Sequence, residues 1–219
     1  MGFKALFVDF YGTIVHEDDK VVEKILQTVC KTGTTDNLIE VDNYWRNEIL
    51  SLFENSHGEL FKTQRVIEKE SLGRTLKHFN SKADLSELCE MMNSHKIKPP
   101  IFDDSISFFT NSPLPIYIVS NIDTSDIYQA ITYHDLHPVD VFTSEDAKSY
   151  KPRLELFNLA LQKTGLNGCE ILHIGDSIAN DVIGASKAGI RALWLNRLKN
   201  PVPDGVTSIC NLEDTFGFL

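Results

Sequence analysis

Short apolar runs, each about the length of a β-strand, recur along this chain, and segments with helical spacing separate most of them. The runs lie at residues 3–9, 116–120, 141–143, 171–175 and 192–195, with a last short candidate at 206–209. The helical segments between the later runs lie at residues 124–133, 153–164 and 180–188. Strands separated by helices of this length are typical of βαβ units, whose strands pair in parallel. The pattern therefore predicts an α/β fold with a parallel sheet and helices on both faces.

One long stretch, residues 20–96, interrupts this alternation, and its apolar residues recur at helical spacing. One stripe contains Val22, Ile25, Leu26 and Val29, and a second contains Tyr44, Trp45, Ile49, Leu52 and Phe53. Further helical segments lie at residues 64–76 and 85–93. We therefore expect a helical insertion over residues 16–96, within a domain formed by residues 1–15 and 97–219.

The composition argues against several classes of function. The chain has 219 residues, of which 42% are hydrophobic, so one domain with an insertion can bury a sizeable core. Acidic residues outnumber basic ones by 31 to 21, whereas nucleic acids and anionic membranes attract clustered lysine and arginine. No apolar run approaches the roughly 18 residues of a membrane span, and the first residues lack the pattern of a signal peptide. We therefore expect a cytoplasmic protein that binds neither nucleic acid nor membrane.

Polar residues follow the apolar runs, or precede the next helix. Those with the chemistry of a catalytic site are Asp9, Ser120, Asn121, Lys151 and Asp176. In an open parallel sheet, ligands bind outside the carboxyl ends of the strands, where these residues would meet. A carboxylate, a hydroxyl, an ammonium group and a second carboxylate can supply a nucleophile, a donor, a cation and a metal ligand. The sequence therefore predicts a phosphate-sized site at this edge of the sheet.

Four segments resemble, in the same order, the four motifs of the haloacid dehalogenase-like hydrolase superfamily. They are Asp-Phe-Tyr-Gly-Thr at 9–13, Val-Ser-Asn at 119–121, Lys-Pro at 151–152 and Gly-Asp-Ser-Ile-Ala-Asn-Asp at 175–181. Together they span nearly the whole chain. The resemblance implies a Rossmann-like core, a helical cap that closes over the site, and covalent catalysis through an aspartyl intermediate.

The resemblance also implies a role for each matching residue. Asp9 is implied to be the nucleophile, and Ser120 to hold the transferring group with help from the backbone of Asn121. Lys151 is implied to neutralise the charge between the nucleophile and the substrate. A carboxylate that attacks an anionic phosphoryl group is repelled until cations cancel the charge, so a lysine and a hard metal ion suit this chemistry.

A Mg²⁺ site is implied by the same resemblance. Asp176 is implied to join Asp9 and the main-chain carbonyl oxygen of Tyr11 around the ion, with Asp181 behind them or bound through water. The three carboxylates of Asp9, Asp176 and Asp181 would repel one another strongly at one rim without a cation. Their number favours a divalent metal.

One position departs from the phosphatase pattern. Family phosphatases have a second Asp two residues after the nucleophile, which protonates the leaving alcohol and then activates water, and this chain has Tyr11 there. The branch that cleaves 2-haloacids has Tyr at this place, because a halide leaves without a proton. The segment at 45–50 also resembles that branch's cap helix, which implies that Arg46 helps to bind the halide. The alternative interpretation of Arg46 is a solvated helix residue.

The fourth motif favours the phosphatase branch. Metal-free haloacid dehalogenases resemble Ser-x-Asn-x-x-Asp in this loop, whereas this chain has Asp176, Ile178 and Asp181. The carboxylate that binds metal is present, and Ile178 replaces the Asn of the dehalogenase branch. We interpret the nearby His173 as a strand residue and not as a ligand.

We therefore interpret the chain as a Mg²⁺-dependent hydrolase of a small, anionic phosphorylated metabolite, with a phospho-aspartyl intermediate on Asp9. The loss of a positioned acid and base costs roughly 10²- to 10⁴-fold in rate, so we expect slow turnover of ordinary esters. The hydroxyl of Tyr11 is a weak substitute donor. Two alternatives stay open, a 2-haloacid dehalogenase with the same nucleophile and a catalytically weak relative that binds a phosphorylated ligand or a partner protein.

Overall fold

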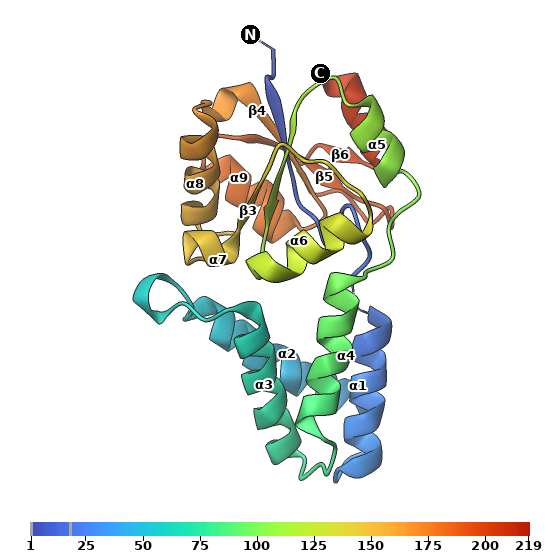
Figure 1. The fold of residues 1–219 in the computed structure, drawn as a ribbon. Helices are drawn as coiled ribbons and strands as arrows, with labels where there is room; N and C mark the ends of the chain where they lie inside the picture. Colours follow the sequence, from blue (N-terminus) through green and yellow to red (C-terminus); the bar gives the residue numbers. More distant parts are fainter. Residues whose placement is uncertain (1, 18) are drawn as a thin grey trace.

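A six-stranded parallel sheet forms the core in the computed structural model, which describes residues 2–17 and 19–219 (Figure 1). Its strands are β1 (Ala5–Val8), β2 (Ile116–Ser120), β3 (Asp140–Thr143), β4 (Ile171–Gly175), β5 (Arg191–Leu195) and β6 (Ser208–Ile209). They lie in the order β3-β2-β1-β4-β5-β6, and neighbouring strands pair in parallel. This is the strand order of a Rossmann-like sheet, the fold that the sequence predicts. The chain adds strands first on one side of β1 and then on the other, and ligands bind at this switch point between β1 and β4 in such folds.

Both faces of the sheet are buried. Leu6 and Val8 of β1 belong to the apolar cluster on one face, and Ala5 and Phe7 belong to the cluster on the other. The first face is covered by α5 (Ser105–Asn111) and α6 (Thr124–Tyr133), and the second by α7 (Ser144–Ala147), α8 (Leu154–Thr164) and α9 (Gly184–Lys187). Side chains alternate between the two faces of a strand, so burial on both sides explains why β1 is apolar throughout.

Four helices form a separate layer, which we call the cap, beside the edge of the sheet at which β1 ends (Figure 1). They are α1 (Asp19–Thr32), α2 (Leu38–Glu54), α3 (Gln64–His78) and α4 (Leu85–Ile97). Their apolar stripes meet in one cluster that includes Ile25, Trp45 and Leu72. The indole N–H of Trp45 donates to the hydroxyl of Ser71 at 3.0 Å, so this aromatic residue is satisfied inside the cap. The boundary expected after residue 96 falls in the last turn of α4.

The cap helices begin in two different ways. Asn37 accepts hydrogen bonds from two backbone N–H groups at the start of α2, and Asp84 does the same for α4, as N-cap residues do. The side chain of Thr63 makes no such bond at the start of α3.

In the described part of the chain, no helix has both the length and the apolar character needed to cross a membrane.

Several elements differ from the sequence prediction. The helix expected at 180–188 begins earlier, with a π-helical turn over Ile178–Ile183, and continues as α9. Turns of this kind are frequent at functional sites, and this one carries Asp181. The helices α5 and α7 lie where none was expected, and the candidate strand at 206–209 pairs over two residues only.

Candidate active site

Asp9 lies directly after β1, at the point between β1 and β4 where the strand order switches from one side of the sheet to the other. Its backbone N–H donates to the carbonyl oxygen of Ile174 in β4 at 2.9 Å, which ties the residue to the sheet. The side chain is 10% exposed, so it is nearly buried but still reaches a cavity. Beyond it the chain turns at Gly12, whose φ of +82° favours glycine, and continues toward the cap.

Lys151 links the carboxylate of Asp9 to that of Asp181. Its Nζ donates to Oδ1 of Asp9 at 2.8 Å, to Oδ1 of Asp181 at 2.7 Å and to the carbonyl oxygen of Val119 at 2.9 Å. The side chain of Asn121 in turn holds the backbone of the lysine. Its Oδ1 accepts from the N–H of Lys151 at 2.7 Å, and its Nδ2 donates to the carbonyl oxygen at 3.0 Å. Asn121 therefore positions Lys151 with its side chain, a contact that the sequence analysis did not anticipate.

Ser120 ends β2 and lines the same cavity. Its side chain is almost fully buried, and its hydroxyl lies close enough to Asp9 to stabilise the charged carboxylate. The end of β2 therefore brings the hydroxyl of Ser120 next to the carboxylate of Asp9.

Asp176 completes a cluster in which Asp9, Asp176 and Asp181 each offer a carboxylate oxygen within 4.8 Å of the others. The hydroxyl of Thr13 donates to Oδ1 of Asp176 at 3.3 Å, and the indole N–H of Trp194 donates to its backbone carbonyl oxygen at 2.7 Å. A Cβ atom at position 12 would lie 2.6 Å from the carboxylate of Asp176. Glycine at this turn is therefore required by the approach of the carboxylate as well as by its backbone angle.

The clustered charges shift one another's pKa. Burial, followed by repulsion from Asp9 and Asp181, raises the pKa of Asp176 to about 8. Burial likewise raises the pKa of Asp9, against the attraction of Lys151. Burial acts to raise the pKa of Asp181 as well, but the Lys151 ammonium and a hydrogen bond from His173 lower it overall. The charged form of Asp176 is thus the one that lacks compensation by the groups around it.

The residues at this site fit a hard divalent cation. Carboxylate oxygens are the ligands that Mg²⁺ prefers, and a cation near Asp176 would remove the repulsion that raises its pKa. Both oxygens of Asp181 already accept hydrogen bonds, Oδ1 from Lys151 and His173 and Oδ2 from the N–H of Ser177. The carboxylate of Asp176 is therefore available to a cation, whereas the carboxylate of Asp181 is already held by hydrogen bonds from the protein.

The carboxylates face a cavity of about 480 Å³ between the core and the cap. Seven residues that the sequence implicates line it, namely Asp9, Tyr11, Ser120, Asn121, Lys151, Asp176 and Asp181. The other side is lined by Glu17, Gln64, His95 and Lys96, which no sequence motif indicates. Among the described residues that line the cavity, Ile122 is the only aliphatic one. Such a lining suits a polar, charged small molecule.

Arg46 is a correction to the sequence analysis, because the structure does not bring it to this cavity. Its side chain is 65% exposed, and its Nε donates to both oxygens of Asp42 at 2.8 Å, one turn earlier in α2. Successive residues of an α-helix are rotated by about 100°, and the preceding Trp45 faces the apolar centre of the cap. The solvated interpretation of Arg46 matches its position.

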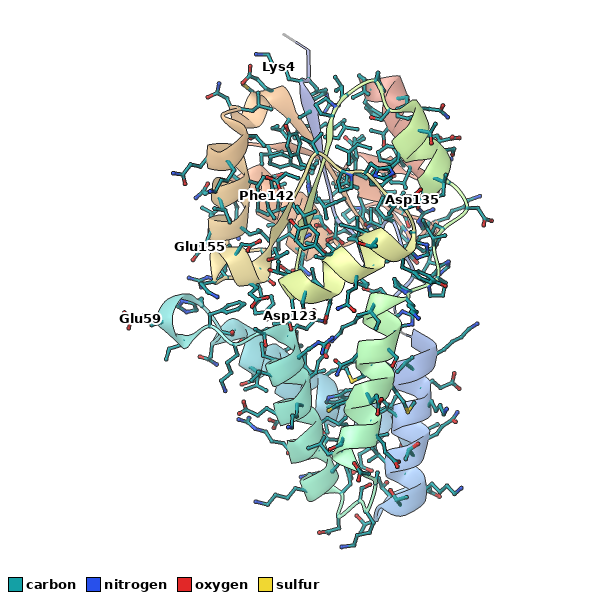
Figure 2. The ribbon with its side chains drawn as sticks, viewed as in Figure 1. Lys4, Glu59, Asp123, Asp135, Phe142 and Glu155 are labelled. Carbon is teal, nitrogen blue, oxygen red and sulfur yellow. The ribbon has the colours of Figure 1, made fainter. Side chains whose placement is uncertain are left out.

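The sequence also contains no indication of a connection between the cap and the core. Asp123, labelled at the junction in Figure 2, accepts hydrogen bonds from the backbone N–H groups of Gln64 at 2.6 Å and Arg65 at 3.0 Å. A core residue thus caps the cap helix α3. The guanidinium of Arg65 also pairs with the buried carboxylate of Asp126, at 2.8 and 2.5 Å. Capping motifs are recognised in a sequence only when the capping residue precedes its own helix, so no local signal could indicate this one.

Comparison with known sequences identifies relatives of the chain. A family model described as haloacid dehalogenase-like hydrolase matches residues 3–189. The HAD-hydrolase YfnB of Bacillus subtilis (strain 168) is 33% identical over 110 residues, which make up 48% of this chain and 47% of that protein. The aligned region thus spans about half the length of this curated relative.

Solved structures share the whole fold. A magnesium-bound crystal structure of YfnB from Bacillus subtilis superposes with a TM-score of 0.76 at 21% identity, covering 99% of this chain and 98% of that one. The L-2-haloacid dehalogenase RSc1362 gives 0.80 at 18% identity, with 100% and 99% covered. A HAD phosphatase from Thermococcus onnurineus gives 0.68 at 19% identity, with 98% and 97% covered. Because the family model covers most of the sequence and the fold agrees throughout, the chain belongs to the haloacid dehalogenase-like hydrolase family.

Proposed function

We propose that this chain is a Mg²⁺-dependent phosphohydrolase that cleaves small, polar phosphate esters through a phospho-aspartyl intermediate on Asp9. The observation that carries the proposal is the cluster of Asp9, Asp176 and Asp181 within 4.8 Å, with Lys151 contacting two of the three. A phosphate dianion would be repelled from such a site unless a divalent cation is bound. A 2-haloacid, with a single carboxylate, gives no reason to keep Asp176 as an additional undercompensated charge.

In the first step of the proposed reaction, a carboxylate oxygen of Asp9 attacks phosphorus. The bond between phosphorus and the leaving-group oxygen breaks, and its electron pair goes to that oxygen, which takes a proton from solvent water to form the alcohol. Lys151 reduces the repulsion between the nucleophile and the phosphoryl oxygens. The hydroxyl of Ser120 and the backbone of Asn121 line the same cavity and are proposed to bind those oxygens.

In the second step, water attacks phosphorus of the phospho-aspartyl group and gives up a proton to solvent. The bond between phosphorus and the Asp9 oxygen breaks and its electron pair returns to the carboxylate, which releases inorganic phosphate. The two steps together convert an ester and one water molecule into an alcohol and inorganic phosphate. When bound by Asp9, Asp176 and the carbonyl oxygen of Tyr11, Mg²⁺ would supply positive charge to the phosphoryl oxygens. In both steps Asp181 holds Lys151, because its Oδ1 accepts a hydrogen bond from Nζ of the lysine at 2.7 Å.

The cap side of the cavity suggests the kind of leaving group. Glu17 and Gln64 offer acceptors, and His95 and Lys96 offer nitrogen atoms, so groups that both donate and accept hydrogen bonds suit this wall. Hydroxyl groups do both. The Oε1 atom of Gln64 is buried and has no hydrogen-bond partner among the described residues, so an alkyl or aryl leaving group would leave this acceptor unsatisfied, which costs affinity. We therefore propose hydroxylated phosphate esters as the substrate class.

A 2-haloacid dehalogenase is the second candidate, and Tyr11 is the observation that favours it. Two observations argue against it. Arg46 is exposed and does not line the cavity, so it is not placed to bind a halide there, and the lining of the cavity is polar. A haloalkanoate carries an alkyl group that gains from apolar surface, and among the described lining residues Ile122 is the only aliphatic contribution.

A substrate screen with two readouts tests the proposal. Purified protein is incubated with a panel of phosphate esters and 2-haloacids, with Mg²⁺ or with chelator, and released phosphate and halide are measured. We expect phosphate release that depends on Mg²⁺ and is fastest with hydroxylated esters. Halide release that survives chelation would instead establish the dehalogenase. Binding of Mg²⁺ and phosphate esters without turnover would establish the catalytically weak relative.

A further inference from the structure

His173 is a polar residue in an apolar part of the sheet. It lies in the middle of β4, is fully buried, and packs edge-on against the ring of Phe157 with 5.3 Å between the ring centres. Its Nε2 lies 3.0 Å from Oδ1 of Asp181. Burying an imidazole costs free energy unless a hydrogen bond compensates, and this contact is the compensation that the described residues supply.

The surroundings of the ring indicate which nitrogen carries the proton. Nδ1 is buried and has no hydrogen-bond partner among the described residues, so no acceptor is available there for an N–H group. Nε2 faces a carboxylate oxygen, which would repel a lone pair and accepts a proton donor. The geometry therefore assigns the proton to Nε2, with His173 donating to Asp181.

A continuous series of contacts runs from His173 to the nucleophile. Oδ1 of Asp181 accepts from His173 at 3.0 Å and from Nζ of Lys151 at 2.7 Å, and the same Nζ donates to Asp9 at 2.8 Å. The other oxygen of Asp181 accepts from the N–H of Ser177 at 3.0 Å. Donors on both oxygens fix the rotation of the carboxylate, and without His173 the Lys151 ammonium would be the remaining side-chain donor among these contacts.

We propose that His173 is a positioning residue for catalysis, which orients Asp181 and through it holds the Lys151 ammonium against Asp9. The proposal rests on the proposed function of Asp9 and Lys151, and it adds a residue that does not line the cavity. Groups that orient charged residues at such sites typically change activity by about 10- to 100-fold when removed. The effect should fall on kcat, because the substrate does not touch His173.

A pair of variants separates positioning from packing. His173→Gln keeps an N–H donor near the place of Nε2, whereas His173→Met has a similar length and no donor. We expect His173→Met to lower kcat by about 10- to 100-fold with little change in KM, and His173→Gln to restore most of the loss. Ile171→Met is the control, because Ile171 lies on the same face of the same buried strand, in an apolar cluster whose members include none of the catalytic residues. Melting temperatures of the variants report whether each one is folded.

Nitrogen NMR of histidine-labelled protein tests the contact without any turnover. The signals of His173 are those missing from His173→Gln, and their pattern reports which ring nitrogen carries the proton. We expect a proton on Nε2 and a shift of this signal in Asp181→Asn. A proton on Nδ1, equal kcat values for the Met and Gln variants, or an equal loss in Ile171→Met would each overturn the inference. If the wild type releases no phosphate, the proposed function fails and the catalytic role of His173 fails with it, while the NMR result still decides the contact.

Discussion

The hydroxyl of Tyr11 donates a hydrogen bond to the backbone carbonyl oxygen of Lys96 at 2.6 Å. Tyr11 lies two residues after the proposed nucleophile, and Lys96 lies in the last turn of α4, where the chain leaves the cap. The side chain at the position of the phosphatase acid therefore connects the catalytic loop to the cap. In this arrangement the phenolic proton is directed at a carbonyl oxygen, so it is not offered to a leaving group.

Replacing Tyr11 by Asp tests whether the missing acid limits the reaction. The new carboxylic acid should protonate the leaving oxygen, so hydrolysis of alkyl phosphates should rise by roughly 10-fold or more, while aryl phosphates gain little. Aryl groups leave readily without a proton. The measurement is the ratio of alkyl to aryl phosphate turnover in folded protein saturated with Mg²⁺.

Tyr11→Phe is the matched control, because it removes the hydrogen bond to Lys96 without adding an acid. This variant should leave the ratio unchanged and alter both substrates alike. A ratio that stays flat or falls in Tyr11→Asp removes the missing acid as the cause of slow turnover. A dehalogenase would only lose activity, since the substitution places another negative charge beside Asp9.

Replacing the proposed nucleophile Asp9 by Asn should abolish turnover and preserve the fold. The amide is nearly isosteric but lacks the nucleophilic charge, and removing one of three crowded carboxylates should not lower the melting temperature. The control is Asp135→Asn. The side chain of Asp135 is 92% exposed and lies on the surface of the domain that contains the sheet, away from the cap (Figure 2). Substantial activity in Asp9→Asn, with deamidation excluded by mass spectrometry, would rule Asp9 out.

The core and its catalytic edge could be predicted because their signals are local. Asp9 and Asp176 each follow a buried apolar strand, and strands that pair in parallel bring their carboxyl ends together. Contacts between distant segments carry no such signal. The hydrogen bond from Tyr11 to Lys96 joins residues 85 positions apart, and the capping of α3 by Asp123 spans 59. The sequence left two interpretations of Arg46 open, because a resemblance in sequence does not fix which side of a helix faces a cavity.

The pKa of Asp176 predicts how Mg²⁺ binding depends on pH. Burial and the neighbouring carboxylates raise this pKa from 3.8 to about 8 in the folded protein. A carboxyl group whose pKa is raised on folding stabilises the folded state fully at pH values below its pKa in the unfolded chain. That contribution is lost as the pH rises through the folded-state pKa of about 8. Mg²⁺ must displace the proton, so its apparent affinity should fall about tenfold for each pH unit below about 8.

Thermal unfolding with and without Mg²⁺ checks this expectation, because a ligand that binds only the folded state raises the melting temperature. The increase should be larger at pH 8 than at pH 6, and Asp176→Asn should reduce it at both. The same variant without Mg²⁺ should melt above the wild type at pH 8, since a charge that its neighbours repel is gone. Equal shifts at both pH values, or no shift at all, would count against a metal on Asp176.

The carboxylate of Asp123 predicts a test of how the cap is held on the core. It accepts the first backbone N–H groups of α3, and removing a capping side chain costs about 0.5–2 kcal/mol. Because this bond exists only while the cap rests on the core, Asp123→Ala should favour an open cap. We expect kcat/KM to fall by about 2- to 30-fold, the equivalent of that free energy. Hydrogen exchange at the first turn of α3 should become faster.

Asp84 offers a matched control for Asp123, because it also accepts two backbone N–H groups at the start of a cap helix. Asp84 lies in the connection between α3 and α4, at the end of the cap away from the core (Figure 1). Asp84→Ala should therefore lower the free energy of unfolding by a similar amount while kcat/KM stays near the wild-type value. Asp123→Asn, which keeps an acceptor oxygen, should lie between Asp123→Ala and the wild type. If the two alanine variants change kcat/KM equally, the loss reflects a weakened cap helix, and the contact between Asp123 and α3 has no part in closing the site.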